Sequence, residues 1–117
     1  MSSSLIIIDK APYGRENAMS GIYIAIASLD KGIKFDILLM GDGVYVALKN
    51  QSSDKAIHYP SVSELIYSIF PNGTLFVHLA SLIERGIKYE DLIEIAELVD
   101  GKTLYNISKT KKHILKI

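Results

Sequence analysis

The residue with the clearest capacity for chemistry is His78, near the end of the apolar run Thr74-Leu-Phe-Val-His-Leu79. An imidazole at the end of a buried strand can hold a proton or contact an anion near neutral pH. The same placement fits a part-buried histidine hydrogen-bonded to a neighbouring loop, and the spacing alone favours this structural role. Neither His58 nor His113 has a second ligand at helical or hairpin spacing, so we predict no metal site.

Two glycine-containing turns supply the other candidate residues. Gly41-Asp-Gly43 follows the apolar run 35–40, and Asp42 there fits a helix N-cap better than a ligand contact. The loop Lys10 to Arg15 follows the run 5–8, and its basic side chains can neutralise an anion or simply be solvated. Its Tyr13 can form a pocket wall or contact a partner subunit. The candidate ligand-binding residues are therefore Tyr13, Gly14, Arg15, Gly41, Asp42, Gly43 and His78.

These residues are expected to meet because each follows a predicted strand. The run of β-preferring residues at 5–8 shows no polar alternation, which is typical of a strand covered on both faces, and residues 34–40 and 74–79 are the second and third predicted strands. Parallel strands direct their following loops to one edge, where helices begin and backbone N–H groups are exposed. Such an edge suits a small anion. Neither the phosphate-loop pattern nor the three-glycine dinucleotide fingerprint occurs, so we predict no cofactor.

Short helical patterns alternate with these strands. Helices are expected from about residue 17 to 31, at 43–48 and 65–69, and as one turn opened by a capping box, Ser81-Leu-Ile-Glu84. The segment Leu92–Val99 fits a helix or a strand. Asp100 is a predicted N-cap, and a last strand covers 113–117. The alternation predicts one α/β domain over residues 1–117, with a parallel sheet and helices on both faces.

Two surface features suggest contacts between subunits. The helix from residue 17 is apolar on both sides, through Ile22 and Ala25 on one and Tyr23 and Ile24 on the other, which predicts a subunit interface more than isolated exposed side chains. Carboxylates gather between residues 84 and 97, and lysines between 102 and 116. The simplest explanation of this charge pattern is two solvated faces. The more specific hypothesis is a complementary contact between subunits.

Composition excludes several classes of function. The 117 residues have a formal net charge of zero, which argues against direct binding to nucleic acid or to an anionic membrane. No apolar run approaches the ~20 residues of a membrane span, and no signal-peptide pattern opens the chain, so we expect a cytoplasmic protein. The sequence contains no cysteine, which excludes disulfides, thiolate metal sites and cysteine nucleophiles.

Three stretches resemble the DsrE/DsrF-like family of small sulfur-relay proteins, and the DsrF/TusC branch most closely. They are Ala11-Pro-Tyr-Gly14, Leu39-Met-Gly-Asp-Gly-Val44 and Phe76-Val-His-Leu-Ala-Ser-Leu-Ile-Glu-Arg-Gly86. The resemblance implies a three-layer α/β/α fold with a five-stranded parallel sheet, a strand over Leu92–Val99, and assembly into trimers or hexamers. It also implies persulfide transfer between cysteines, toward transfer-RNA thiolation or sulfur oxidation. Sulfur-carrying members have a cysteine where this chain has His78.

A persulfide requires a thiol, so this chain cannot carry sulfur itself. The leading hypothesis is a non-catalytic, oligomeric subunit, structural or anion-binding, in a sulfur-relay assembly. It would form homo-oligomers or join a cysteine-bearing DsrE-like relative. One alternative is an enzyme that uses His78 as a general acid or base on a small anionic substrate. The other is a homo-oligomeric metabolite-binding protein.

Overall fold

Five parallel strands form a single sheet. The computed structural model describes residues 4–10, 17–29, 31–48 and 73–117. The strands are β1 (Ser4–Ile8), β2 (Phe35–Leu39), β3 (Leu75–His78), β4 (Ala96–Val99) and β5 (His113–Lys116), in the order β4-β3-β2-β1-β5. Every neighbouring pair is parallel. The sequence prediction of a parallel α/β sheet is therefore confirmed.

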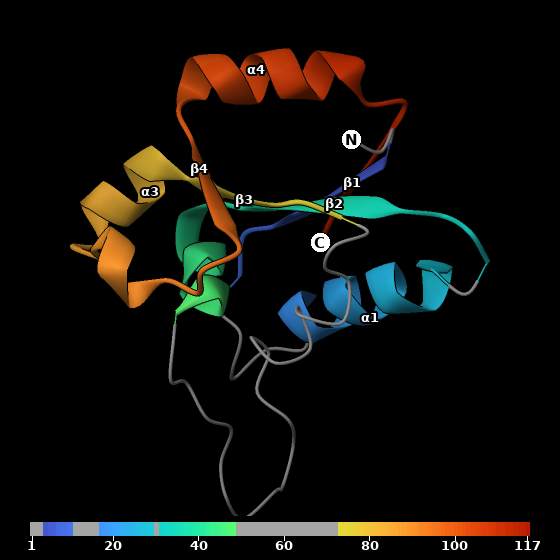
Figure 1. The fold of residues 1–117 in the computed structure, drawn as a ribbon, viewed down its shortest axis with the longest axis horizontal. Coiled ribbons are helices and arrows are strands. Elements are labelled where there is room, and N and C mark those ends of the chain that lie inside the picture. Colours follow the sequence, from blue (N-terminus) through green and yellow to red (C-terminus); the bar gives the residue numbers. More distant parts are fainter. Residues whose placement is uncertain (1–3, 11–16, 30, 49–72) are drawn as a thin grey trace, which may run out of the picture.

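Helices cover both faces of this sheet, which makes three layers (Figure 1). The helix α1 (Asn17–Leu29) and the 3₁₀ helix η1 (Gly41–Ala47) lie on one face, and α4 (Gly101–Thr110) lies on the other. The short helices α3 (Leu79–Glu84) and η2 (Tyr89–Asp91) connect β3 to β4. Because β1, β2 and β3 are parallel, their carboxyl ends lie at one edge of the sheet.

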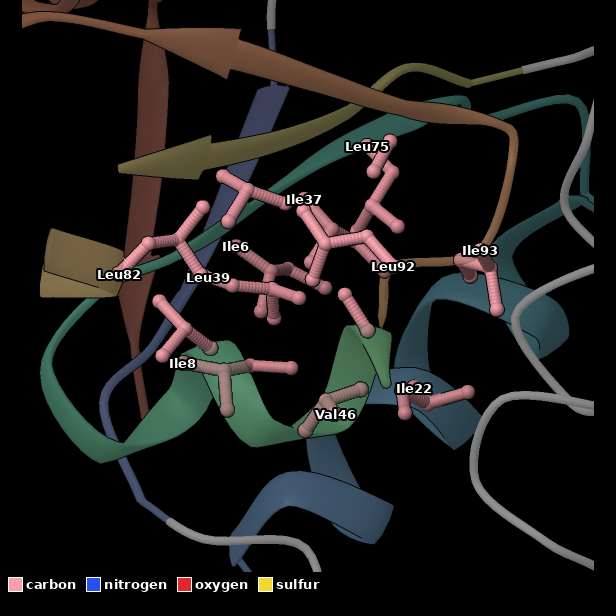
Figure 2. Packing of buried hydrophobic residues seen from close by; sticks show 14 of the residues in the cluster. Ile6, Ile8, Ile22, Ile37, Leu39, Val46, Leu75, Leu82, Leu92 and Ile93 are labelled. Carbon is pink, nitrogen blue, oxygen red and sulfur yellow. The ribbon is translucent and has the colours of Figure 1, made fainter. Parts of the chain in front are cut away.

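The larger core fills the space between the sheet, α1 and η1 (Figure 2). Its strands contribute buried side chains such as Ile6, Ile37 and Leu75, which meet Ile22 of α1 and Val46 of η1. A Cβ at Gly21 would lie 3.3 Å from side-chain atoms of the strand layer, so glycine there allows α1 to approach closely. The strands are covered by α1 and η1 on this face and by α4 on the other, which explains why β1 and β3 consist almost entirely of apolar residues.

A buried ion pair lies next to the smaller core, which is under α4. Leu5, Leu38, Phe76 and Val99 of the sheet contact Ile107 of α4 in this layer. Beside it, the Lys111 ammonium contacts the Asp36 carboxylate, and both side chains are almost completely inaccessible to solvent. The second carboxylate oxygen of Asp36 accepts a hydrogen bond from the Thr74 N–H, at 2.9 Å. The pair thus joins the segment before β5 to β2 and to the start of β3.

The structure changes two predicted elements. Helix η1 begins at Gly41 instead of residue 43, and it is a 3₁₀ helix because the Gly43 N–H donates to the Met40 carbonyl three residues before it. The strand predicted over Leu92–Val99 covers only Ala96–Val99. Residues before it bond to the end of η1, where the Ile93 N–H donates to the Ala47 carbonyl.

Other expectations have mixed outcomes. Asp100 caps α4 as predicted, since its carboxylate accepts a 2.7 Å hydrogen bond from the Thr103 N–H. The outer face of α1 is exposed, with Tyr23 at 49% and Ile24 at 37% accessibility, and its role as an interface stays a prediction. The helix predicted at 65–69 lies outside the described residues. No helix in the described ranges is long and apolar enough to span a membrane.

Candidate functional site

The carboxyl ends of β1, β2 and β3 bring several of the predicted residues together. Gly41, Asp42 and Gly43 form the start of η1, and His78 ends β3 immediately before α3. Hydrogen bonds and an ion pair join these two junctions. Tyr13, Gly14 and Arg15 lie outside the described residues, so their place in the site stays a prediction.

Ser81 connects the two junctions. Its hydroxyl oxygen accepts a 2.9 Å hydrogen bond from the Gly41 N–H and lies 2.8 Å from Nδ1 of His78. The predicted capping box is wrong, because α3 begins at Leu79 after an extended His78, which leaves Ser81 inside the helix. Sequence reasoning treated Ser81 as a cap; its position three residues after His78 was the available signal for a contact between them.

His78 is half-buried, and among the residues that the structure describes only one of its ring nitrogens has a hydrogen-bond partner. Either the Ser81 hydroxyl donates to Nδ1 or a protonated Nδ1 donates to the Ser81 oxygen. Within the described part of the chain, Nε2 has no hydrogen-bond partner. The bond to Ser81 fixes the ring orientation. Both roles foreseen for His78 remain open in this arrangement: a structural histidine, or one that presents Nε2 to a ligand.

Asp42 pairs with Arg85 instead of capping a helix. Two guanidinium nitrogens of Arg85 lie 3.0 and 3.1 Å from one oxygen of Asp42. A third donates to the Ser81 carbonyl, at 3.1 Å. The cap position of η1 is Met40, which makes no side-chain cap bond, so the N-cap prediction for Asp42 is wrong. Arg85, which sequence reasoning missed, joins η1 to α3.

The two glycines of the turn are required by geometry. Gly41 has a φ of +55°, a conformation that residues with a Cβ rarely adopt. A Cβ at Gly43 would lie 2.0 Å from the carbonyl oxygen of Ile8. The turn therefore passes directly over the end of β1. This close approach explains the Gly-Asp-Gly pattern without any ligand.

Asp9, directly after β1, completes the described edge. Its carboxylate lies 3.6 Å from the Lys10 ammonium and 3.4 Å from the Lys116 ammonium at the end of β5. Its Oδ1 is buried and has no hydrogen-bond partner within the described residues. Sequence reasoning missed Asp9 because the order of strands, with β5 beside β1, decides that Lys116 lies next to it.

The chemistry available at this edge is limited. Ser81 is 5% exposed and its oxygen is already hydrogen-bonded, so it is poorly placed to attack a substrate. No thiol exists anywhere in the sequence. The described residues contain no group of three or more histidine, aspartate or glutamate side chains arranged to hold a metal ion. Proton exchange or anion contact at the free nitrogen of His78 is the chemistry that these groups supply.

Comparisons with known proteins agree with this architecture. The model of the DsrE/DsrF-like family matches residues 3–117. An uncharacterized protein of Methanocaldococcus jannaschii is 34% identical over 111 residues, covering 94% of this chain and 95% of its own. A Vibrio vulnificus protein named Protein TusC homolog is 24% identical over 117 residues, covering 98% of both chains. The crystal structure of the ychN protein from E. coli superimposes with a TM-score of 0.87 at 21% identity and full coverage of both chains.

Proposed function

The chain belongs to the DsrE/DsrF-like family, and we propose that it is a non-catalytic, oligomeric subunit of a cytoplasmic sulfur-relay assembly. The observation that carries the proposal is the absence of cysteine from all 117 residues. Persulfide transfer proceeds through a thiolate, so a member without cysteine retains the scaffold but not the family chemistry. A cysteine-bearing relative then carries the sulfur. The TusC homolog among the relatives supports this assignment.

The internal contacts of the carboxyl edge support a role as a rigid wall. Ser81 and Arg85 hold the β2–η1 and β3–α3 junctions together through direct bonds. In the sulfur-carrying members that this chain resembles, a cysteine stands at the position of His78. In our proposal His78 offers Nε2 to a small anion or to the partner's sulfur, beside Gly41, Asp42 and Gly43. We propose that Tyr13, Gly14 and Arg15, which lie outside the described residues, belong to the same site.

Affinity purification of the tagged chain from its native cells tests the proposal. We expect a cysteine-bearing DsrE-like relative to co-purify at fixed stoichiometry. Incubating the purified complex with a sulfur donor and a persulfide-specific label should mark the partner and not this chain. Recovery of the chain as a homo-oligomer without such a partner would overturn the relay assignment.

One observation favours a second candidate, in which His78 is a general acid or base for a small anionic substrate. The Ser81 hydroxyl fixes the ring through Nδ1, and a fixed ring with a free Nε2 is what proton transfer requires. The substitution His78→Gln removes the titratable imidazole and keeps a polar side chain that can still form hydrogen bonds. Turnover that survives this change would eliminate the enzymatic role.

A further inference from the structure

Helix α4 presents positive charge on its exposed side. The helix covers the face of the sheet opposite α1 and η1 (Figure 1). Ile107 is buried against the sheet, whereas Lys102, Tyr105 and Lys109 are exposed. Their spacing of three and four residues places these side chains along one outer face of the helix. Lys112, in the turn after α4, is also exposed. We call Lys102, Tyr105, Lys109 and Lys112 the basic stripe.

The three lysines of the basic stripe are not paired with carboxylates. Residues 101–117 contain five lysines and no acidic side chain. Within the described residues, the lysines of the stripe form no ion pair. Asp100, which precedes α4, accepts a hydrogen bond from the Thr103 N–H. The zero net charge of the whole chain, which argues against binding to nucleic acid, therefore conceals a surface that is locally positive.

Helix stability explains only part of this charge. A lysine in the last turn of a helix, such as Lys109, interacts favourably with the helix dipole. Lys102 lies in the first turn of α4, where the dipole disfavours a positive charge. Attraction to the Asp100 carboxylate offsets part of this cost. The stripe as a whole therefore requires a reason other than the stability of α4.

Tyr105 adds a flat aromatic surface to the stripe. It is 61% exposed, and the Lys109 ammonium lies 4.4 Å from the centroid of its ring. This cation–π contact holds the ring and a positive charge side by side. Within α4, all of which the structure describes, Tyr105 is the one large apolar residue that is exposed. An aromatic ring among lysines is the combination that receives an unpaired base and its neighbouring phosphates.

We propose that the basic stripe binds single-stranded RNA, with its lysines on the phosphates and Tyr105 stacked on an unpaired base. Surfaces that bind proteins are depleted in lysine, and a single exposed ring offers little apolar area for such a contact. A duplex keeps its bases stacked internally, so it would engage the lysines but not Tyr105. Unpaired bases flanked by phosphates are accessible in RNA loops.

The size of the stripe sets the expected strength of binding. Lys102 and Lys109 lie about 10 Å apart along the helix axis, so a few nucleotides cover the surface. Affinity should be in the micromolar range at low salt. Three lysine–phosphate contacts predict a slope of roughly −2 for the logarithm of the binding constant against that of salt concentration. Raising the salt from about 50 to about 200 mM should then weaken binding roughly twentyfold.

Fluorescence anisotropy on the purified chain tests the proposal, with a labelled oligouridylate of about 12 nucleotides as the probe. Lys109→Gln with Lys112→Gln should weaken binding and reduce the salt slope to about −0.7, because one phosphate contact remains. Tyr105→Ala should weaken binding at least about fivefold without changing the slope, since it removes stacking and no charge. Tyr105→Phe should bind like the native chain.

A matched control is Lys31→Gln with Lys88→Gln, which removes the same charge at exposed positions outside α4. This control should bind RNA like the native chain. All of these positions are exposed, and circular dichroism verifies that each variant is folded.

Four results would overturn the proposal. They are no binding at about 100 μM protein in low salt, equal losses in the control and the stripe variant, no effect of Tyr105→Ala, and tighter binding of oligothymidylate than of the RNA. Polyglutamate that binds more tightly than the RNA would also overturn it, in favour of an acidic protein partner. The assay uses this chain alone, so the relay function and RNA binding can fail separately.

Discussion

The buried ion pair between Asp36 and Lys111 gives a quantitative prediction about stability. Replacing Lys111 with methionine removes the ammonium but retains most of the side-chain volume. The Asp36 carboxylate, 1% exposed, would keep only the 2.9 Å hydrogen bond from the Thr74 N–H among the contacts described for it. A buried charge without its partner is strongly unfavourable, because water no longer solvates it.

The expected loss is a large part of the total stability. Removing one partner of a buried pair costs about 3–5 kcal/mol, whereas a domain of this size has roughly 5–15 kcal/mol. At about 4 °C per kcal/mol for a domain of this length, Tm should fall by roughly 12–20 °C. Replacing both residues, as Asp36→Leu with Lys111→Met, should recover part of the loss. The Thr74 N–H would then lack its acceptor, at a cost of about 1–3 kcal/mol.

Urea unfolding followed by circular dichroism measures these differences, with the neighbouring Lys112→Met as the control. Lys112 is exposed and forms no ion pair within the described residues, so its replacement should change stability by less than about 0.5 kcal/mol. A loss below about 1 kcal/mol for Lys111→Met would refute the assignment of a stabilising charge pair. So would a double variant no more stable than the single one.

Three further predictions concern the turn, the site and the cap. Gly43→Ala should lower the free energy of unfolding, measured in urea, by more than about 3 kcal/mol, because the added Cβ would lie 2.0 Å from the Ile8 carbonyl oxygen. Gly101→Ala is the control: no atom lies within 4 Å of its Cβ, so this change should be neutral or stabilising. Equal losses in the two variants would contradict this reasoning. Ser81→Ala should lower the free energy of unfolding by about 1–3 kcal/mol, because the Gly41 N–H after β2 would lose its hydrogen-bond acceptor. An unchanged midpoint of urea unfolding would contradict this expectation. The hydrogen bond from the Thr103 N–H of α4 lowers the pKa of Asp100. The ionised Asp100 carboxylate therefore stabilises the folded chain above about pH 4, and this contribution is lost as the pH falls through the lowered pKa. The Tm advantage of the native chain over Asp100→Asn should therefore shrink in acid, and a constant difference would refute the effect.

Much of the fold followed from local sequence patterns. The apolar run at 5–8 lacks polar alternation because β1 is covered on both faces, and the alternation of strands with short helical patterns predicted the parallel sheet. Asp100 was correctly predicted as the N-cap of α4, because an N-cap depends only on residues that are close in sequence. The family resemblance rested on three stretches: Ala11–Gly14, the Gly-Asp-Gly turn and the segment around His78. The family match over residues 3–117 confirmed it.

Local reasoning failed where a distant residue decided the outcome. Ser81 has the spacing of a cap, but the Gly41 amide, forty residues earlier, engages its hydroxyl. Asp42 also fits a cap by sequence, yet Arg85 engages its carboxylate. The strand predicted from Leu92 begins only at Ala96, because the preceding backbone bonds to the end of η1.

The sequence by itself determined that this chain carries no thiol and that the strands β1, β2 and β3 are largely buried, because composition and periodicity do not depend on how the chain folds. Only the tertiary structure decided which residues meet. The order β4-β3-β2-β1-β5 brings Lys116 to Asp9, Lys111 to Asp36, and the acidic and basic segments to opposite edges. Strand order depends on the packing of helices against the whole sheet, and no local pattern encodes it.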